Sequence, residues 1–273
     1  MNGKDLNGRD ILIGLSIKFM GDWEKIYKAA CSRDVKNLEP FYEVFRKSKC
    51  KAVTFFDPEY PQILKQIYNP PFVLFYYGDI TLAHNPSKCL SIIGTRHPSP
   101  YGAKMAEHIS KELSNDFVIV SGMAKGIDGI AQRSAIESGN KTIGIIGSGI
   151  ERCYPSDNKD LYFQLKKNQL IMSEYFGYIT PDQSHFPLRN RIIAGLSKAT
   201  LIVEAKNRSG TSITATFALS FGRSVLAVPD RAETDSACNK LIKEGAVLVE
   251  SAQDVIEELS GIAFVGSEIQ QNS

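Results

Sequence analysis

The chain has 273 residues, of which 43% are hydrophobic and 23% charged, and its formal net charge at pH 7 is +2. This length and composition fit one large α/β domain with a small appendage, and they exclude disordered and fibrous proteins. The small net charge also excludes a histone-like basic field, so any polyanion must be bound by a local arrangement of basic residues.

Cysteine, histidine and hydropathy patterns exclude further classes. The five cysteines form no CxxC pair and the four histidines form no HxxxH or HxH pair, so neither a disulfide framework nor a metal site is expected. No apolar run reaches the roughly 20 residues of a membrane span, and the polar N-terminus does not resemble a signal peptide. We therefore expect a cytoplasmic protein without a cofactor and without a membrane partner.

Residues 1–50 are predicted to form a small helical region. Apolar and aromatic residues recur there at helical spacing, and Trp23 with its neighbours is expected to belong to a core. From Lys51 the residue pattern changes. It predicts two short strands in the β-rich runs 51–56 and 72–78, with one or two helical turns between them in residues 62–68.

Residues 51–265 are predicted to form one extended Rossmann-like domain of the α/β class. Apolar runs alternate there with amphipathic helical patterns, which is typical of a doubly wound, mostly parallel sheet with right-handed crossovers. Helices are expected to begin after Ser99, Gly126 and Gly210. Further strands are expected at residues 89–94, 117–122, 142–149, 170–174, 199–205, 224–229 and 246–250. Residues 266–273 are expected to be a disordered tail.

Unusual residues gather at the predicted carboxyl ends of these strands, where an open parallel sheet binds its ligands. Glycine there allows backbone N–H groups to point into the crevice, and the helix starts that follow suit phosphate. A glycine after a strand is also common merely to turn the chain, so each turn alone is a weak signal. The strand-end residues are Gly94, Thr95 and Arg96; Ser121, Gly122 and Lys125; Gly147 and Gly149; Glu204; and Ser209 and Gly210.

A basic segment, residues 184–203, opens an apolar helix that leads into a buried strand. Arg189 and Arg191 flank Asn190, and their guanidinium groups could converge on one anion with the free N–H groups of the first turn. Between residues 181 and 210 there are five basic and two acidic side chains. One of the two arginines could instead bond inward to a helix carbonyl or to Glu204.

Two aromatic residues accompany these basic groups. Phe186 lies beside the arginines and Tyr101 follows Arg96, a combination that binding sites for single strands use to stack bases. For Phe186, a core position at the start of the helix is an equal alternative.

Known catalytic patterns are missing from the sequence. There is no GxGxxG, no P-loop and no GxSxG, and no histidine is evidently paired with a nucleophile. Asp128 and Glu204 could form an acid and base pair, although carboxylates at strand ends more often cap a helix or bond a turn. An enzyme is therefore not predicted. The alternative is a nucleotide-processing enzyme that resembles the nucleoside-monophosphate phosphoribohydrolases, with Glu204 as acid or base.

Taken together, these motifs resemble the DNA-processing protein A (DprA, also called Smf) family of bacteria. The match runs from about Thr54 to Glu250 in the family's order. It is carried by SIIGTRHPSPYG (91–102), IVSGMAKGIDGIAQ (119–132), TIGIIGSGIERCYP (142–155), FPLRNRIIAGLS (186–197), VEAKNRSGTSITA (203–215) and GRSVLAVP (222–229).

The resemblance implies a single-stranded DNA-binding protein of natural transformation, or competence, which protects incoming DNA and loads the recombinase RecA onto it. It also implies an extended Rossmann fold, a homodimer through the C-terminal part of that fold, and no enzymatic activity. The DNA-binding set expected from the motifs and the resemblance is Gly94, Arg96, Ser121, Gly122, Lys125, Phe186, Arg189, Asn190, Arg191, Ser209 and Gly210.

The chain departs from the family's pattern in three places. Gly129 and Gln132 stand where the family usually has GIDAxAH, and Asp230 and Ala237 replace glycines of later turns. Fewer than 25 residues follow Glu250, so we expect a short form without the winged-helix domain that many members carry there.

Overall fold

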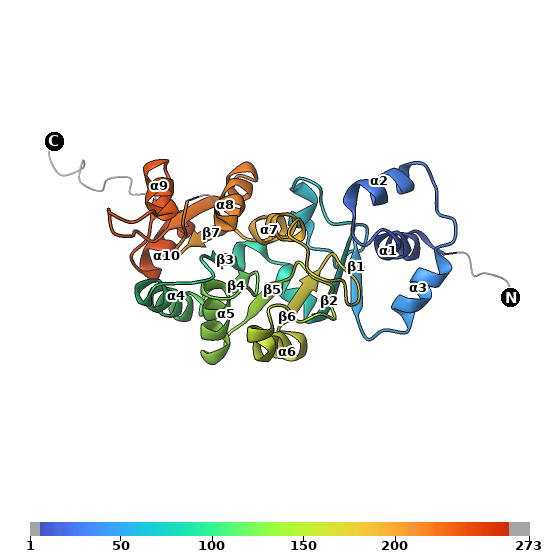
Figure 1. Ribbon diagram of the computed structural model, residues 1–273, viewed down its shortest axis with the longest axis horizontal. Coiled ribbons are helices and arrows are strands. Elements are labelled where there is room, and N and C mark those ends of the chain that lie inside the picture. Colours follow the sequence, from blue (N-terminus) through green and yellow to red (C-terminus); the bar gives the residue numbers. More distant parts are fainter. Residues whose placement is uncertain (1–5, 208, 262–273) are drawn as a thin grey trace, which may run out of the picture.

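The computed structural model of the protein describes residues 6–207 and 209–261 (Figure 1). Within this part of the chain, nine strands form one sheet in the order β1-β2-β6-β5-β4-β3-β7-β8-β9. The strands are β1 (Lys51–Thr54), β2 (Val73–Gly78), β3 (Cys89–Ile93), β4 (Val118–Ser121), β5 (Thr142–Ile145), β6 (Leu170–Ser173), β7 (Ala199–Ile202), β8 (Ser224–Ala227) and β9 (Val247–Leu248). Each lies within a segment for which the sequence predicts a strand. Arg208 and the tail predicted at 266–273 lie outside the described residues.

Strands β3 to β9 pair in parallel, whereas β1 and β2 add an antiparallel edge next to β6. The strands from β3 to β7 are almost completely buried, as expected of parallel strands that are covered on both faces. The predicted α/β class with a mostly parallel, doubly wound sheet is confirmed.

Helices cover both faces of this sheet. One core contains residues of α7 (His185–Leu196), α8 (Gly210–Ser220) and α9 (Ala237–Lys243), and a second contains residues of α4 (Pro100–Leu113), α5 (Ile127–Glu137) and α10 (Ala252–Ser260). A third core joins α6 (Lys159–Asn168) with α1 (Gly8–Lys18). Helix α4 begins as predicted, because the Ser99 hydroxyl caps it by accepting a hydrogen bond of 3.1 Å from the Gly102 N–H.

The N-terminal region consists of α1, α2 (Trp23–Cys31) and α3 (Glu39–Arg46), at the end of the molecule next to β1 and β2 (Figure 1). Trp23 is half-buried and stacks on Phe72 and on Tyr27, each at 5.1 Å between ring centres. Its indole N–H donates to the Pro70 carbonyl at 2.9 Å. Trp23 therefore joins α2 to the segment that precedes β2. The boundary between a helical region and a sheet domain at residues 50 and 51 stays a prediction.

The order of the strands creates a crevice at the carboxyl ends of β3 and β7. From β3 the chain continues through α4 to β4 on one side, whereas from β7 it continues through α8 to β8 on the other side. The connections diverge between these two neighbouring strands, which is where open α/β sheets bind their ligands.

Candidate nucleic-acid interface

Two adjoining cavities lie at this edge of the sheet. The first, which we name the Tyr154 pocket, has a volume of about 230 Å³ and lies at the ends of β3, β4 and β5. The second, which we name the Ser209 pocket, has a volume of about 330 Å³ and lies at the ends of β3 and β7. Arg96, Phe186 and Arg189 line both cavities. The two cavities therefore share one wall.

Arg189 lies at this shared wall and is only 6% exposed. Its Nη1 donates to the Ile145 carbonyl at 2.8 Å. A Cβ atom on Gly122 would lie 1.6 Å from the same Nη1, so only glycine leaves room for the guanidinium at the end of β4. Burial and, to a smaller extent, the charge of Arg96 lower the pKa of Arg189 to about 10, against the attraction of Asp128. Nε is buried without a hydrogen-bond partner among the described residues.

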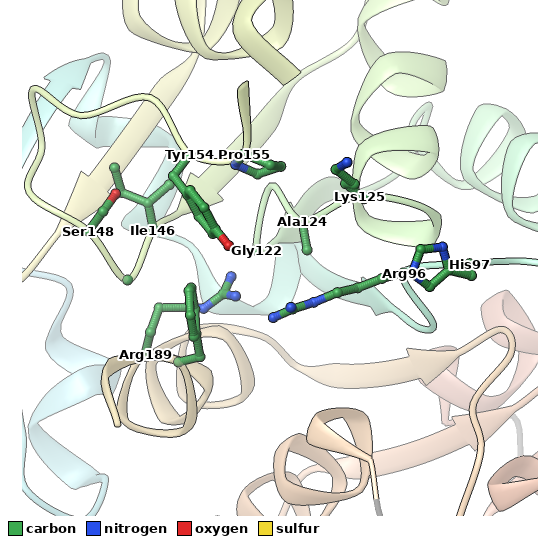
Figure 2. Close-up of a pocket in the computed structure, with 12 residues that line it drawn as sticks. Arg96, His97, Gly122, Ala124, Lys125, Ile146, Ser148, Tyr154, Pro155 and Arg189 are labelled. Carbon is green, nitrogen blue, oxygen red and sulfur yellow. The ribbon is translucent and has the colours of Figure 1, made fainter. Parts of the chain in front are cut away.

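Arg96 approaches the same space from the end of β3. It is exposed, its guanidinium lies 5.4 Å from the centre of the Phe186 ring, and it points toward the guanidinium of Arg189 (Figure 2). Two like charges that face one another repel, and an anion bound between them would attract both and offset that repulsion. The geometry therefore suits an anion such as a phosphate group.

Phe186 is half-buried and lines both cavities, so it is neither a core ring nor freely exposed. Its ring contacts Tyr154 at 5.9 Å between centres, with 31° between the planes. Tyr101 is not brought to this place: it lines neither cavity, and its hydroxyl donates to the Pro229 carbonyl at 3.2 Å. The predicted role of Tyr101 as a ring near the phosphate groups is thus not supported by its position.

The start of α8 forms the far side of the Ser209 pocket. Gly94, Asn190, Ser209 and Gly210 all line this cavity. The Asn190 side-chain amide donates to the Gly210 carbonyl at 3.2 Å, which ties α7 to the first turn of α8. These four residues come from three separate segments of the sequence, and the fold brings them together.

Arg191 does not reach either cavity, and its predicted role as a phosphate ligand is corrected here. Its guanidinium makes two hydrogen bonds with the Glu174 carboxylate, at 2.6 and 2.7 Å, and the two side chains are 2% and 9% exposed. It also donates to the carbonyls of Asn69 and Leu188. The inward-facing alternative is the one found: Arg191 bonds the helix carbonyl of Leu188, and its carboxylate partner is Glu174 in place of Glu204.

The predicted role of Ser121 in binding DNA through its side chain is also wrong. Ser121 is fully buried, and its hydroxyl donates to the Ile92 carbonyl at 2.6 Å, so its side chain connects β4 to β3. Lys125, by contrast, is exposed at the rim of the Tyr154 pocket, with its ammonium 2.9 Å from the Asp157 carboxylate. Such an exposed ion pair is worth little and leaves the lysine available for another anion.

The carboxylates of the two candidate acid and base residues both accept hydrogen bonds from a turn or a helix start. Asp128 is buried and accepts a hydrogen bond of 3.0 Å from the Gly122 N–H. Burial raises the pKa of Asp128, although Arg189 and backbone N–H groups act in the opposite direction. Glu204 accepts from the N–H and hydroxyl of Ser99, the latter at 2.8 Å, and lines neither cavity. The turn-bonding and helix-capping alternatives describe both carboxylates.

Tyr154 was missed by the sequence reasoning, although it stands within a segment that carries the family resemblance. It is exposed and lines the cavity that bears its name. Asn158 was missed as well: it is buried, and its amide donates to the carbonyls of Met123 and Ala124, at 3.0 and 2.9 Å, which shapes the turn after β4. For Tyr154, the sequence signal that could have found it was a tyrosine shortly after the glycine-rich end of a predicted strand.

The departures from the family's pattern are accommodated within the fold. Gln132 is buried in α5, and its amide donates to the Ile143 carbonyl of β5 at 3.0 Å. Near α9, the Asp230 N–H donates to the Asn239 side chain at 2.9 Å, and the Ala237 N–H donates to the Ala205 carbonyl at 2.8 Å. Residues 230–239 thus form a bonded turn without the glycines that the family usually has there.

Across residues 6–207 and 209–261, no helix has the length and apolar character needed to span a membrane. In the same part of the chain, no three or more His, Cys, Asp and Glu side chains are grouped so as to hold a metal ion.

Known proteins include some with a sequence or a fold similar to that of this chain. Residues 51–260 match the model of the family of DNA recombination-mediator protein A. The DNA processing protein DprA of Bacillus subtilis is 38% identical over 243 residues, which cover 86% of this chain and 82% of the relative.

Solved structures of related proteins also resemble this one. The X-ray structure of DNA processing protein A from Streptococcus pneumoniae superimposes with a TM-score of 0.77 and 36% identity, over 93% of this chain and 94% of the other. A structure of DNA processing protein A from Helicobacter pylori, described for its mode of binding single-stranded DNA, superimposes with a TM-score of 0.71 and 30% identity, over 78% of this chain and 97% of the other.

Proposed function

The chain belongs to the family of DNA recombination-mediator protein A, and from this membership we propose that it binds single-stranded DNA at the Tyr154 and Ser209 pockets. The observation that carries the proposal is the pair of guanidinium groups of Arg96 and Arg189, which face one another at the wall the two pockets share. The single-stranded DNA binding described for the Helicobacter pylori relative supports it.

In this proposal the strand crosses the carboxyl ends of β3, β4 and β7. Arg96, Arg189 and Lys125 contact phosphates, and Phe186 presents its ring to a base. The backbone and small side chains of Gly94, Gly122, Asn190, Ser209 and Gly210 line the path of the strand. Arg191 and Ser121 support the fold beneath this path.

Replacing Arg96 with alanine is the direct test of the site. We expect Arg96→Ala to weaken single-strand binding about tenfold for all sequences alike, because a charge-assisted contact to phosphate is lost. The log–log dependence of affinity on salt should flatten by about 0.7 for each phosphate contact removed. The measurement is a fluorescence titration with single-stranded and duplex oligonucleotides at several salt concentrations. Arg46→Ala, an exposed arginine on α3 outside both pockets, is the control.

The titration can contradict the proposal in two ways. Tighter binding of the duplex than of the single strand would overturn the class of ligand. An Arg96→Ala titration that coincides with the unchanged protein and with Arg46→Ala would overturn the site.

We further propose that the protein acts in the cytoplasm during natural transformation, where it protects incoming single strands and loads RecA onto them. Membership of the mediator family supports this role. The decisive measurement is the rate at which RecA filaments assemble on single strands already coated by a single-strand-binding protein. An unchanged rate in the presence of this chain would refute the loading role.

A homodimer through the C-terminal part of the fold belongs to the same proposal. Ile213 and Leu219 on α8 and Leu248 of β9 are exposed apolar side chains in that part, with Leu219 61% exposed. We expect Leu219→Arg to shift the protein toward the monomer in sedimentation velocity, because a charge would have to be buried in the interface. Met20→Arg, in the N-terminal region and 63% exposed, should leave the distribution unchanged. An equal distribution for both variants would argue against this surface.

A further inference from the structure

The Tyr154 pocket differs from an open groove in its size and in its two unlike sides. Its volume of about 230 Å³ lies below the roughly 300–1,000 Å³ typical of pockets for drug-sized ligands, so it can hold no more than about one nucleotide unit. A DNA strand of several nucleotides can therefore place only one nucleotide inside the Tyr154 pocket.

One side of the pocket is polar and built around a buried charge. The hydroxyl of Tyr154 and the guanidinium groups of Arg96 and Arg189 point into the same space (Figure 2). Arg189 is more than nine-tenths buried, and its Nε lacks a partner among the described residues. Three donor groups that converge on one space, two of them cationic, match the oxygens of a phosphate group.

The charges of the surroundings leave an excess of about one positive charge on this side. Asp128 opposes the charge of Arg189, and Asp157 opposes that of Lys125 at 2.9 Å. Within the described part of the chain, no Asp or Glu lines the pocket to oppose the charge of Arg96. This excess attracts a phosphate group, whose charge is −1 in a phosphodiester and about −1.5 to −2 in a monophosphate at pH 7.

Apolar groups form another part of the pocket's wall. Ala124, Ile146 and Pro155 belong to it together with the rings of Tyr154 and Phe186, whose centres are 5.9 Å apart. A flat base or a sugar can lie against such a wall, since every base has an apolar face. The pocket thus pairs a site for one phosphate with a surface for one nucleoside.

We infer that the Tyr154 pocket is a mononucleotide-binding pocket that also accepts free nucleoside monophosphates, with the Tyr154 hydroxyl as a ligand of the phosphate. The inference rests on the proposed function, because it concerns the same site. Free nucleotides then compete with single-stranded DNA for Arg96 and Arg189. A monophosphate is held without the neighbouring contacts of the Ser209 pocket, so it binds more weakly than a strand.

The test uses the full chain and the probe dTMP. Isothermal titration calorimetry should give saturable binding with one dTMP per chain, and dTMP should displace a fluorescent oligo-dT. Thymidine, which lacks the phosphate, should bind at least about tenfold more weakly. Tyr154→Phe keeps the ring and removes the hydroxyl, and it should weaken dTMP about tenfold. Tyr68→Phe, an exposed tyrosine outside both pockets, is the matched control and should change nothing.

The outcomes distinguish a failure of this inference alone from a failure of the proposed function. If the oligonucleotide binds and dTMP neither binds nor displaces it, the inference fails and the proposed function stands. If neither ligand binds, both fail. If dTMP binds but Tyr154→Phe and Tyr68→Phe behave alike, the pocket is not the dTMP site as assigned.

Discussion

Replacing Glu174 with alanine is expected to lower the free energy of unfolding by about 3–5 kcal/mol, the typical cost of removing one partner of a buried ion pair. The physical reason is the position of Arg191. Burial disfavours its charged form, but Glu174 outweighs burial and raises the pKa of Arg191. Without the carboxylate, a charge that is almost completely buried remains without a counter-ion.

Urea unfolding followed by circular dichroism measures this loss. Glu43→Ala is the matched control, because Glu43 pairs with Arg46 on the surface at 2.7 Å, where such pairs contribute less than about 1 kcal/mol. The double variant Glu174→Leu with Arg191→Met should recover part of the stability, since it removes the buried charge as well. A cost for Glu174→Ala no greater than that for Glu43→Ala would show that Arg191 is solvated in solution and free to bind phosphate.

Replacing Gly122 with alanine is expected to weaken single-strand binding about 10- to 100-fold, the range that corresponds to a lost charge-assisted hydrogen bond. The added Cβ would overlap Nη1 of Arg189, at 1.6 Å, so the guanidinium must leave the Ile145 carbonyl and the shared wall of the two pockets. The DNA strand then loses its contact with one of the two guanidinium groups that face the anion site.

A double-variant cycle measures whether this effect acts through Arg189. In an Arg189→Gln background, Gly122→Ala should cause little further loss of affinity, because the displaced group is already absent. Gly8→Ala, at a glycine with open space around its Cβ position, is the control for the glycine replacement itself. Tight binding by a folded Gly122→Ala variant would contradict the role of Arg189 as a phosphate ligand.

The candidate site was predictable where its residues follow strands directly. Arg96 and Gly122 each come just after an apolar run, and the carboxyl ends of neighbouring parallel strands meet at one edge of a sheet. Tyr154 was not predictable in this way. It lies nine residues beyond the last residue of β5, and it reaches the site through the path of the intervening segment, whose first residues Ile146, Gly147 and Ser148 line the same pocket.

The sequence by itself determined the local features of this protein. The nine strand segments, the cap of α4 by Ser99 and the α/β class all follow from patterns that depend on near neighbours in the chain, such as apolar runs, glycine and proline breaks, and helical spacing. Motifs in a familiar order also indicated the family that the comparisons show.

Only the tertiary structure decided which of the two arginines meets the crevice. Residues two apart on an α-helix are separated by about 200° around its axis, so Arg189 and Arg191 point to different sides of α7. One side faces the ends of β4 and β5, and the other faces Glu174, which directly follows β6. Which side was which depended on how α7 packs on the sheet, and that packing is set by residues far apart in the chain.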